Sequence, residues 1–154
     1  MSESARNIIE IRCTPEQLYA YVTQPWLWHE WHPNSKSAHA AVSALQVGDG
    51  FDEVIEIQPL APLPLRLKRA TRYKVLAAEP GTLWKVEGKM KDGWLQIQYE
   101  FKPTPSGTQF TRTLTYGVTG LNRLMLPLPL LRRRMAAISL VALSNLKKRL
   151  EAAA

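Results

Sequence analysis

The spacing of apolar residues changes twice along this chain of 154 residues. An alternating segment, Asn7 to Arg12, predicts a first strand, and two short helical segments follow it. From Ser35 to Val118 apolar and polar residues alternate in successive segments, as in strands with one buried face. After Leu121 the apolar residues recur at steps of three and four, which is the spacing of a helix. This order predicts a sheet closed by one C-terminal helix.

The first helix has a clear start signal. Thr14 supplies an N-cap, Pro15 suits the first helical position, and Gln17 completes a capping box. We therefore expect a helix from about Pro15 to Val22. Pro25 opens a second short helical segment, which Pro33 ends.

The middle of the chain predicts an antiparallel meander. Short turns separate its strands, and parallel neighbours would need much longer crossovers. The predicted strands after Ser35 include Phe51–Ile57, Leu65–Val75, Leu83–Lys89, Trp94–Lys102 and Phe110–Val118, with turns at Asp92-Gly93 and at 103–107. If the first two of these strands are neighbours, outward acids of Phe51–Ile57 lie beside outward bases of Leu65–Val75, which favours cross-strand ion pairs over a binding patch.

The last segment predicts a helix from Leu130 to Leu150, with a kink or break at Pro127 and Pro129. One apolar stripe should lie across the sheet, formed by Leu131, Met135, Ile138, Ala142 and Leu146. A sheet that curves round such a helix leaves a hollow between them, so the pattern predicts a pocket.

Composition limits the classes that remain. The length and the 45% of hydrophobic residues fit one domain spanning residues 1–154. The single cysteine, Cys13, excludes an intramolecular disulfide, and the polar residues 1–6 do not resemble a signal peptide, so we expect a cytoplasmic setting. The longest apolar run, Leu124 to Leu131, is broken by prolines and is too short to span a membrane.

The positive charge is local. Seven of the 20 basic residues but only one of the 13 acidic residues lie after Thr119, so the last segment carries most of the net charge of +7. The charge is therefore a feature of one helix, which weakens the interpretation of the whole protein as a nucleic-acid binder. We therefore expect no nucleic-acid partner.

A longer motif points to a family. Residues 9–33 join a strand to TPEQLYAYVTQPWLWHEWHP, in which Trp28, Trp31 and Pro33 form W-x-x-W-x-P. Further matching pieces are Val47-Gly48-Asp49 and Gly107-Thr108 before Phe110-Thr111-Arg112. The chain resembles the START/Bet v1-like superfamily, also called SRPBCC or polyketide cyclase/dehydrase. The resemblance implies an α+β helix-grip fold, with a seven-stranded antiparallel sheet, two short helices and a long C-terminal helix round a cavity for apolar molecules.

Two charged residues stand among apolar ones on the inward faces of strands. Glu53 lies between Phe51 and Ile55, and Arg112 lies between Phe110 and Leu114. Buried charges need partners, so these two either pair with each other or meet solvent at a rim, or else orient the polar end of a ligand. The candidate ligand-binding residues are Trp28, Trp31, Glu53, Ile55, Tyr73, Trp84, Tyr99, Arg112, Tyr116, Leu131, Met135 and Ile138.

Catalytic and metal motifs are absent from the sequence. His29 and His32 lack a third and fourth ligand, and no HExxH or clustered cysteines support them, so both are interpreted as surface or capping residues. There is no Ser/His/Asp or Cys/His spacing and no glycine-rich phosphate loop. We expect no metal, no cofactor and no assignable catalytic residue.

The main hypothesis is a protein, monomeric or homodimeric, that binds a hydrophobic or aromatic small molecule, lipid-like or polyketide-like. A second is an enzyme resembling polyketide cyclases or dehydrases, in which Glu53, Arg112 or a tyrosine acts as acid, base or oxyanion donor. A third is a peripheral adaptor, in which LMLPLPLLRRRM and the basic helix contact anionic membranes or a protein. Ligand identity stays open at this point.

Overall fold

The computed structural model describes residues 2–58, 63–119 and 128–152. In these ranges the chain forms a seven-stranded antiparallel sheet in the order β1-β7-β6-β5-β4-β3-β2. The strands are β1 (Glu3–Ile11), β2 (Ser35–Ala40), β3 (Gly50–Ile57), β4 (Leu67–Glu79), β5 (Leu83–Met90), β6 (Gly93–Thr104) and β7 (Gly107–Val118). The helices are α1 (Pro15–Val22), the 3-10 helix η1 (Pro25–Glu30) and α3 (Leu128–Ala152). The predicted α+β helix-grip fold is confirmed.

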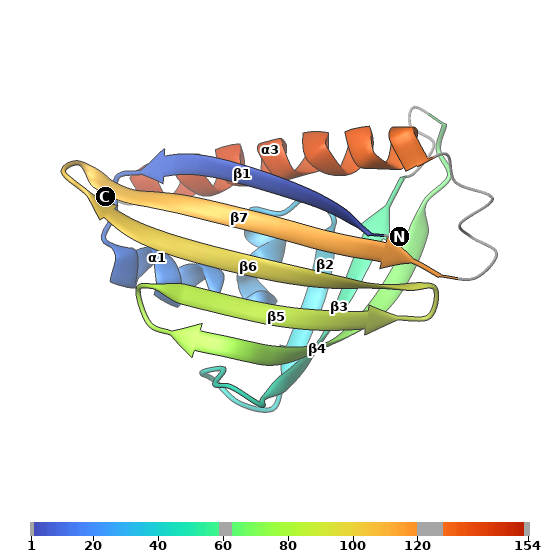
Figure 1. The fold of residues 1–154 in the computed structure, drawn as a ribbon, viewed down its shortest axis with the longest axis horizontal. Helices are drawn as coiled ribbons and strands as arrows, with labels where there is room; N and C mark the ends of the chain where they lie inside the picture. Colours follow the sequence, from blue (N-terminus) through green and yellow to red (C-terminus); the bar gives the residue numbers. More distant parts are fainter. Residues whose placement is uncertain (1, 59–62, 120–127, 153–154) are drawn as a thin grey trace.

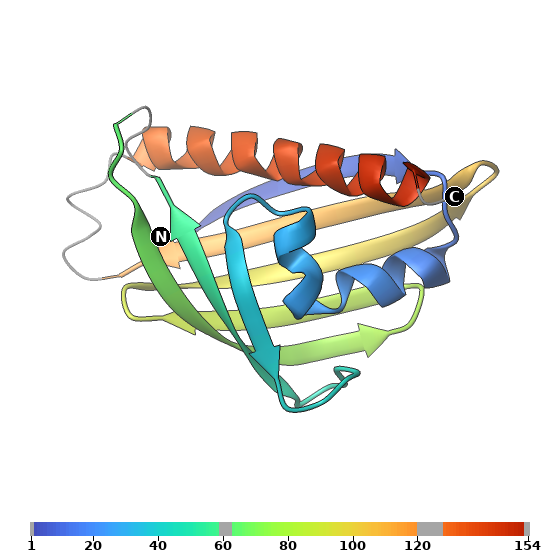
Figure 2. The same ribbon diagram turned by 180° about the vertical axis from the view of Figure 1, so that it is seen from behind.

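The sheet is curved, and α1, η1 and α3 lie on its concave side. Figure 1 shows α3 running alongside β1, and from behind, α1 and η1 lie on the same side of the sheet as α3 (Figure 2). Register shifts between Ser35 and Ser37 and between Val75 and Ala77 mark bulges in β2 and β4. Bulges bend the strand that carries them, so they help β2 and β3 to turn across the remaining strands.

The start of α1 follows its predicted chemistry. The Thr14 side chain accepts a hydrogen bond from the Gln17 backbone N–H, and the Gln17 side chain accepts one from the Thr14 N–H, each at 3.1 Å. This capping box satisfies two amides that the first helical turn leaves free. α1 therefore begins at Pro15 and ends at Val22, as expected.

Several predicted boundaries are wrong by a few residues. β1 begins at Glu3 rather than Asn7, and β4 begins at Leu67 and continues to Glu79. Leu65, predicted to point inward, precedes β4 and is 48% exposed. α3 begins at Leu128, so Pro129 lies in its first turn, where the missing N–H costs no hydrogen bond. The expected break at Pro127 lies outside the described residues.

The outward faces of β3 and β4 pair as the alternation predicted. Arg72 lies opposite Asp52 in the register, and its Nη1 donates to Asp52 Oδ2 at 2.6 Å. Arg66 Nη1 donates to Glu56 Oε1 at 3.2 Å. The exposed bases on this face of the sheet are thus partly neutralised, which agrees with the interpretation as a structural face.

The C-terminal half of α3 is fixed to the rest of the molecule. Ala142, Leu143 and Leu146 are buried against the core. Polar contacts reinforce this packing, because Lys147 Nζ donates to the Glu10 carbonyl at 2.7 Å and Asn145 Nδ2 to the Trp31 carbonyl at 3.1 Å. Among the helices of the described ranges, none has the length and apolar character needed to cross a bilayer.

Candidate functional site

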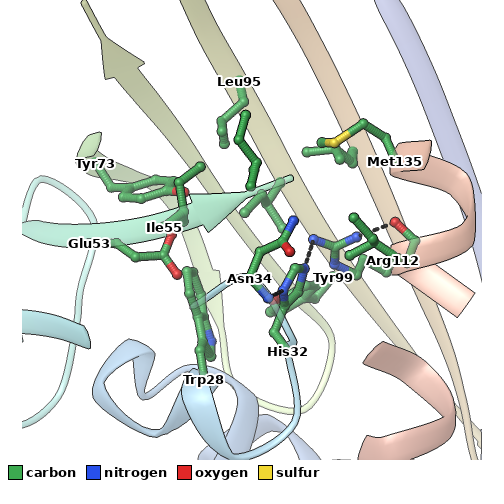
Figure 3. A pocket seen from close by; sticks show the side chains of 15 residues that line it. Trp28, His32, Asn34, Glu53, Ile55, Tyr73, Leu95, Tyr99, Arg112 and Met135 are labelled. Carbon is green, nitrogen blue, oxygen red and sulfur yellow. Dashed lines mark hydrogen bonds between the residues drawn. The ribbon is translucent and has the colours of Figure 1, made fainter. Parts of the chain in front are cut away.

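A cavity of about 60 Å³ lies between the concave face of the sheet and the N-terminal half of α3. Figure 3 shows its side chains, which come from η1, the segment after it, four strands and α3. They are Trp28, His32, Asn34, Glu53, Ile55, Ile57, Tyr73, Leu95, Ile97, Tyr99, Arg112, Leu114, Met135, Ile138 and Ser139. Apolar side chains form most of this wall, and a few polar groups converge on it.

Glu53 occupies one side of the cavity with both carboxylate oxygens engaged. Ser35 Oγ donates to Oε2 at 2.6 Å, and the Tyr73 hydroxyl donates to Oε1 at 2.8 Å. Burial raises the pKa of Glu53, while these two hydrogen bonds and the more distant Arg112 act in the opposite direction. Burial and the neighbouring Glu53 raise the pKa of Tyr73 well above its usual range, so Tyr73 remains a hydroxyl donor.

Arg112 occupies the other side and is only 4% exposed. Its Nη1 donates to Ser139 Oγ on α3 at 3.0 Å, and its Nη2 lies 3.4 Å from His32 Nε2 (Figure 3). Its Nε has no hydrogen-bond partner among the described residues. A direct ion pair between Glu53 and Arg112, one of the expected arrangements, is not formed, because each group is held by neighbours on its own side.

Tyr99 lies close to the guanidinium and completes this polar side. Burial raises the pKa of Tyr99 to about 12, although the charge of Arg112 and a hydrogen bond to it act to lower that pKa. The phenol is therefore protonated at neutral pH. It adds a hydroxyl to the wall next to a fixed positive charge.

His32 is the main residue that the sequence analysis missed. It was interpreted as a surface or capping histidine, but its Nδ1 accepts a hydrogen bond from the Asn34 N–H, at 3.2 Å, in the segment after η1, and this contact caps no helix. The surface part is wrong, because the ring lines the cavity. Burial, and then the charge of Arg112, lower the pKa of His32 to about 3, so the ring is neutral. His29 is exposed, as expected.

The candidate residues divide into three groups. Those that line the cavity are Trp28, Glu53, Ile55, Tyr73, Tyr99, Arg112, Met135 and Ile138. Those that are buried without lining it are Trp31, Trp84 and Tyr116. The side chain of the remaining candidate, Leu131, lies outside the described part of the chain.

The buried aromatic residues that do not line the cavity pack within the core or along the sheet. Trp84 stacks on Tyr99 with ring centroids 5.4 Å apart, and Trp31 lies 6.5 Å from the same ring, so both support the wall from the core side. Tyr116 pairs with Glu3 of β1 in the register, toward the end of β7. All three were expected to contact a ligand, yet they do not line this cavity, because alternation identifies the inward face but not which part of it borders the space.

Some lining residues that the sequence analysis did not select could have been found from the spacing of residues in the sequence. Leu95 and Ile97 lie on the inward face of β6, in alternation with Tyr99, which was already selected. Ser139 lies one helical turn after Met135 and is 1% exposed. Within residues 2–58, 63–119 and 128–152, no three His, Cys, Asp or Glu side chains gather closely enough to hold a metal.

Comparisons with known proteins agree with this architecture. A family model described as polyketide cyclase / dehydrase and lipid transport matches residues 3–151. A comparison with curated proteins gave no match.

Similar solved structures extend over almost the whole chain. A START superfamily protein from Mycobacterium smegmatis superposes with a TM-score of 0.77 at 13% identity, covering 98% of this chain and 99% of that one. A protein of Thermus thermophilus gives 0.75 at 16% identity, covering 99% of each chain.

A third solved structure is the di-domain ARO/CYC StfQ from the steffimycin biosynthetic pathway, with a TM-score of 0.71 at 16% identity. The match covers 98% of this chain and 51% of that one. These identities establish the fold alone, and together with the family match they confirm the resemblance seen in the sequence. The chain belongs to the polyketide cyclase / dehydrase and lipid transport family, and its fold is similar to that of the START superfamily protein.

Proposed function

We propose that this protein binds a small, mainly apolar molecule, aromatic or lipid-like, in the cavity between the sheet and α3. The observation that carries the proposal is the lining itself, in which Ile55, Leu95, Ile97 and Ile138 surround a space that also receives a few fixed polar groups. Binding sites of this kind gain affinity from burial of the ligand's apolar surface, and their polar groups set its orientation.

The cavity volume limits the ligand. About 60 Å³ is well below the roughly 150 Å³ of an engineered cavity that binds benzene. The site therefore accepts a single ring or the end of a chain only when its lining rearranges. Met135 is suited to this role, because its unbranched side chain adapts to irregular spaces and is only partly buried at the cavity.

A size-filling variant tests the proposal. Ile138→Phe fills the space from α3 and should remove apolar adducts that native mass spectrometry detects on protein purified from cells. It should also lower the affinity for an added apolar probe such as octanamide by about tenfold or more, which corresponds to about 1.4 kcal/mol. Leu140→Phe is the matched control, because Leu140 is 60% exposed on the same helix. Equal adduct levels in both variants and the wild type would argue against binding in this cavity.

A second candidate function is catalysis of the cyclase or dehydrase type. The observation that favours it concerns Glu53, a buried carboxylate whose raised pKa suits proton transfer. Glu53 faces a cavity that is also lined by Arg112. Glu53→Gln distinguishes the two functions. It should reduce turnover by about 10²-fold or more if Glu53 transfers a proton, but should shift only affinity if the site merely binds.

The peripheral-adaptor hypothesis concerns another surface. Residues 124–127 of the proposed contact segment lie outside the described residues, and Arg132 lies 3.7 Å from Glu3. Flotation of the protein with anionic and neutral liposomes tests this hypothesis, and the absence of salt-sensitive binding to the anionic vesicles would end it. The proposed cytoplasmic setting depends on cysteine usage alone, that is, on the single Cys13.

A further inference from the structure

The two ring nitrogens of His32 both face hydrogen-bond donors. Nδ1 faces the Asn34 backbone N–H at 3.2 Å, and Nε2 faces Nη2 of Arg112 at 3.4 Å. A neutral imidazole has only one acceptor nitrogen, and the other nitrogen carries a proton. One of these two contacts therefore brings two donors together, whichever tautomer is present.

The local geometry favours the tautomer with the proton on Nε2. The Asn34 N–H is two residues from His32, and the hydrogen bond to Nδ1 fixes the ring at the end of the η1 segment. Nε2–H and Nη2–H then point toward each other at the cavity, with no acceptor between them. A ligand oxygen placed beside these two nitrogens, on the cavity side, would accept from both groups at once.

Arg112 has no carboxylate partner within the part of the chain that the structure describes. It is 4% exposed, its described partners are the hydroxyl groups of Ser139 and Tyr99 and the His32 ring, and its Nε has no partner among residues in the described ranges. A buried guanidinium without a carboxylate is costly unless an anion or water compensates its charge. Glu53 does not fill this role directly, since Ser35 and Tyr73 hold it on the opposite side.

These contacts make the two sides of the cavity different in their free hydrogen-bonding groups. Glu53 presents oxygens that are already hydrogen-bonded, whereas Arg112 and His32 present N–H groups that are not fully used (Figure 3). Apolar side chains of β6 and α3, namely Leu95, Ile97 and Met135, line the same cavity. A ligand that fits both features has an anionic oxygen at one end and an apolar body.

We propose that the natural ligand is an acid, a carboxylate or an enolate-like anion, whose oxygen lies on the cavity side of His32 Nε2 and the Arg112 guanidinium, within hydrogen-bond distance of both, while its apolar part fills the cavity. This inference rests on the proposed binding function and specifies its ligand class.

Two matched ligand pairs test it, namely benzoate with benzamide and octanoate with octanamide. Each pair keeps its shape and differs in charge. We expect the acid of at least one pair to bind about tenfold or more tightly than its amide in calorimetric or NMR titrations, because hydrogen bonds to charged groups are the stronger ones. Equal or tighter binding of the amides would overturn the inference while leaving the proposed binding function intact. Failure of all four to bind, with no adduct on purified protein, would count against both.

Two variants locate the anion. His32→Asn removes the Nε2 donor but keeps a side-chain oxygen that can accept from the Asn34 N–H, as in an Asx turn. Arg112→Gln removes the charge. Each variant should lower the affinity for the acid to about that for its amide. The affinity for the amide should not fall by a comparable factor in either variant. An unchanged preference for the acid in a folded variant would contradict the assignment.

A measurement on the wild-type protein covers the case in which a variant does not fold. Nitrogen-15 NMR of the imidazole should show the neutral Nε2–H tautomer of His32 at pH 7, and the Nε2 resonance should move on addition of the acid. A neutral Nδ1–H tautomer would contradict the inference, because Nε2 would then accept from Arg112 and leave no pair of free donors.

Discussion

At the residue scale, Glu53 links the chemistry of the cavity to pH. Its carboxylate is 4% exposed, and burial raises its pKa above the ordinary value of 4.5. The folded protein therefore binds this proton more tightly than the unfolded chain does. The stabilisation is fully present below pH 4.5 and is lost as the pH rises through the pKa of the folded state.

Glu53→Gln should remove this pH dependence, since glutamine resembles the protonated acid and retains an oxygen for the Tyr73 hydroxyl. We expect the free energy of unfolding of the variant, relative to the wild type, to increase between pH 4.5 and the folded-state pKa. The increase should be about 1.4 kcal/mol for each unit by which the pKa is raised. Urea unfolding at several pH values measures the difference.

The unfolding free energy of the variant must be compared with that of the wild type at each pH, because His32 changes the stability with pH in the opposite direction to Glu53. Its pKa is lowered to about 3 from 6.5, so its contribution is present above pH 6.5 and is lost as the pH falls. The total stability of the wild type mixes the two effects. A difference between Glu53→Gln and the wild type that stays constant with pH would show that Glu53 has no raised pKa.

At the element scale, α3 divides into an anchoring half and a covering half. Leu146 and Ala142 are completely buried in the anchoring half, where Glu151 also pairs with Arg12 at 3.2 Å. Met135 and Ile138, in the covering half, are only partly buried and border the cavity. The packing thus fixes one end of the helix and leaves its other end against the space proposed for the ligand.

Leu146→Ala should therefore destabilise the protein strongly. Leucine-to-alanine changes in a packed core cost about 2 to 5 kcal/mol, because they remove apolar contacts and leave a void. Leu140→Ala on the opposite side of α3 should change the free energy of unfolding by no more than about 0.5 kcal/mol. Urea unfolding of both variants gives the comparison, and similar losses in the two would contradict the assigned orientation of α3.

At the scale of the whole molecule, the sequence predicted the fold better than the site. Alternation and turn signals identified the antiparallel order, and the stripe through Ala142 and Leu146 identified the buried face of α3. These features depend on local spacing. The inward positions of Glu53 and Arg112 were predicted for the same reason.

The partners of these two residues could not be predicted in this way. Glu53 meets Ser35 and Tyr73 from two other strands, and Arg112 meets Ser139 from α3. Such contacts depend on sheet curvature and on where the helix crosses, which periodicity does not determine. His32 was missed for a related reason, since its position after a 3-10 helix gives no face by alternation.

The central claim, that a small apolar molecule binds between the sheet and α3, is tested most directly by intermolecular NOEs. With octanoate or octanamide bound to methyl-labelled protein, the account predicts NOEs from the ligand to the methyl groups of Leu95, Ile97 and Ile138. The exposed methyl groups of Leu140 and Val141, on the outer side of the same helix, should show none. NOEs confined to those outer methyl groups, or none to the cavity methyl groups at saturating ligand, would contradict it.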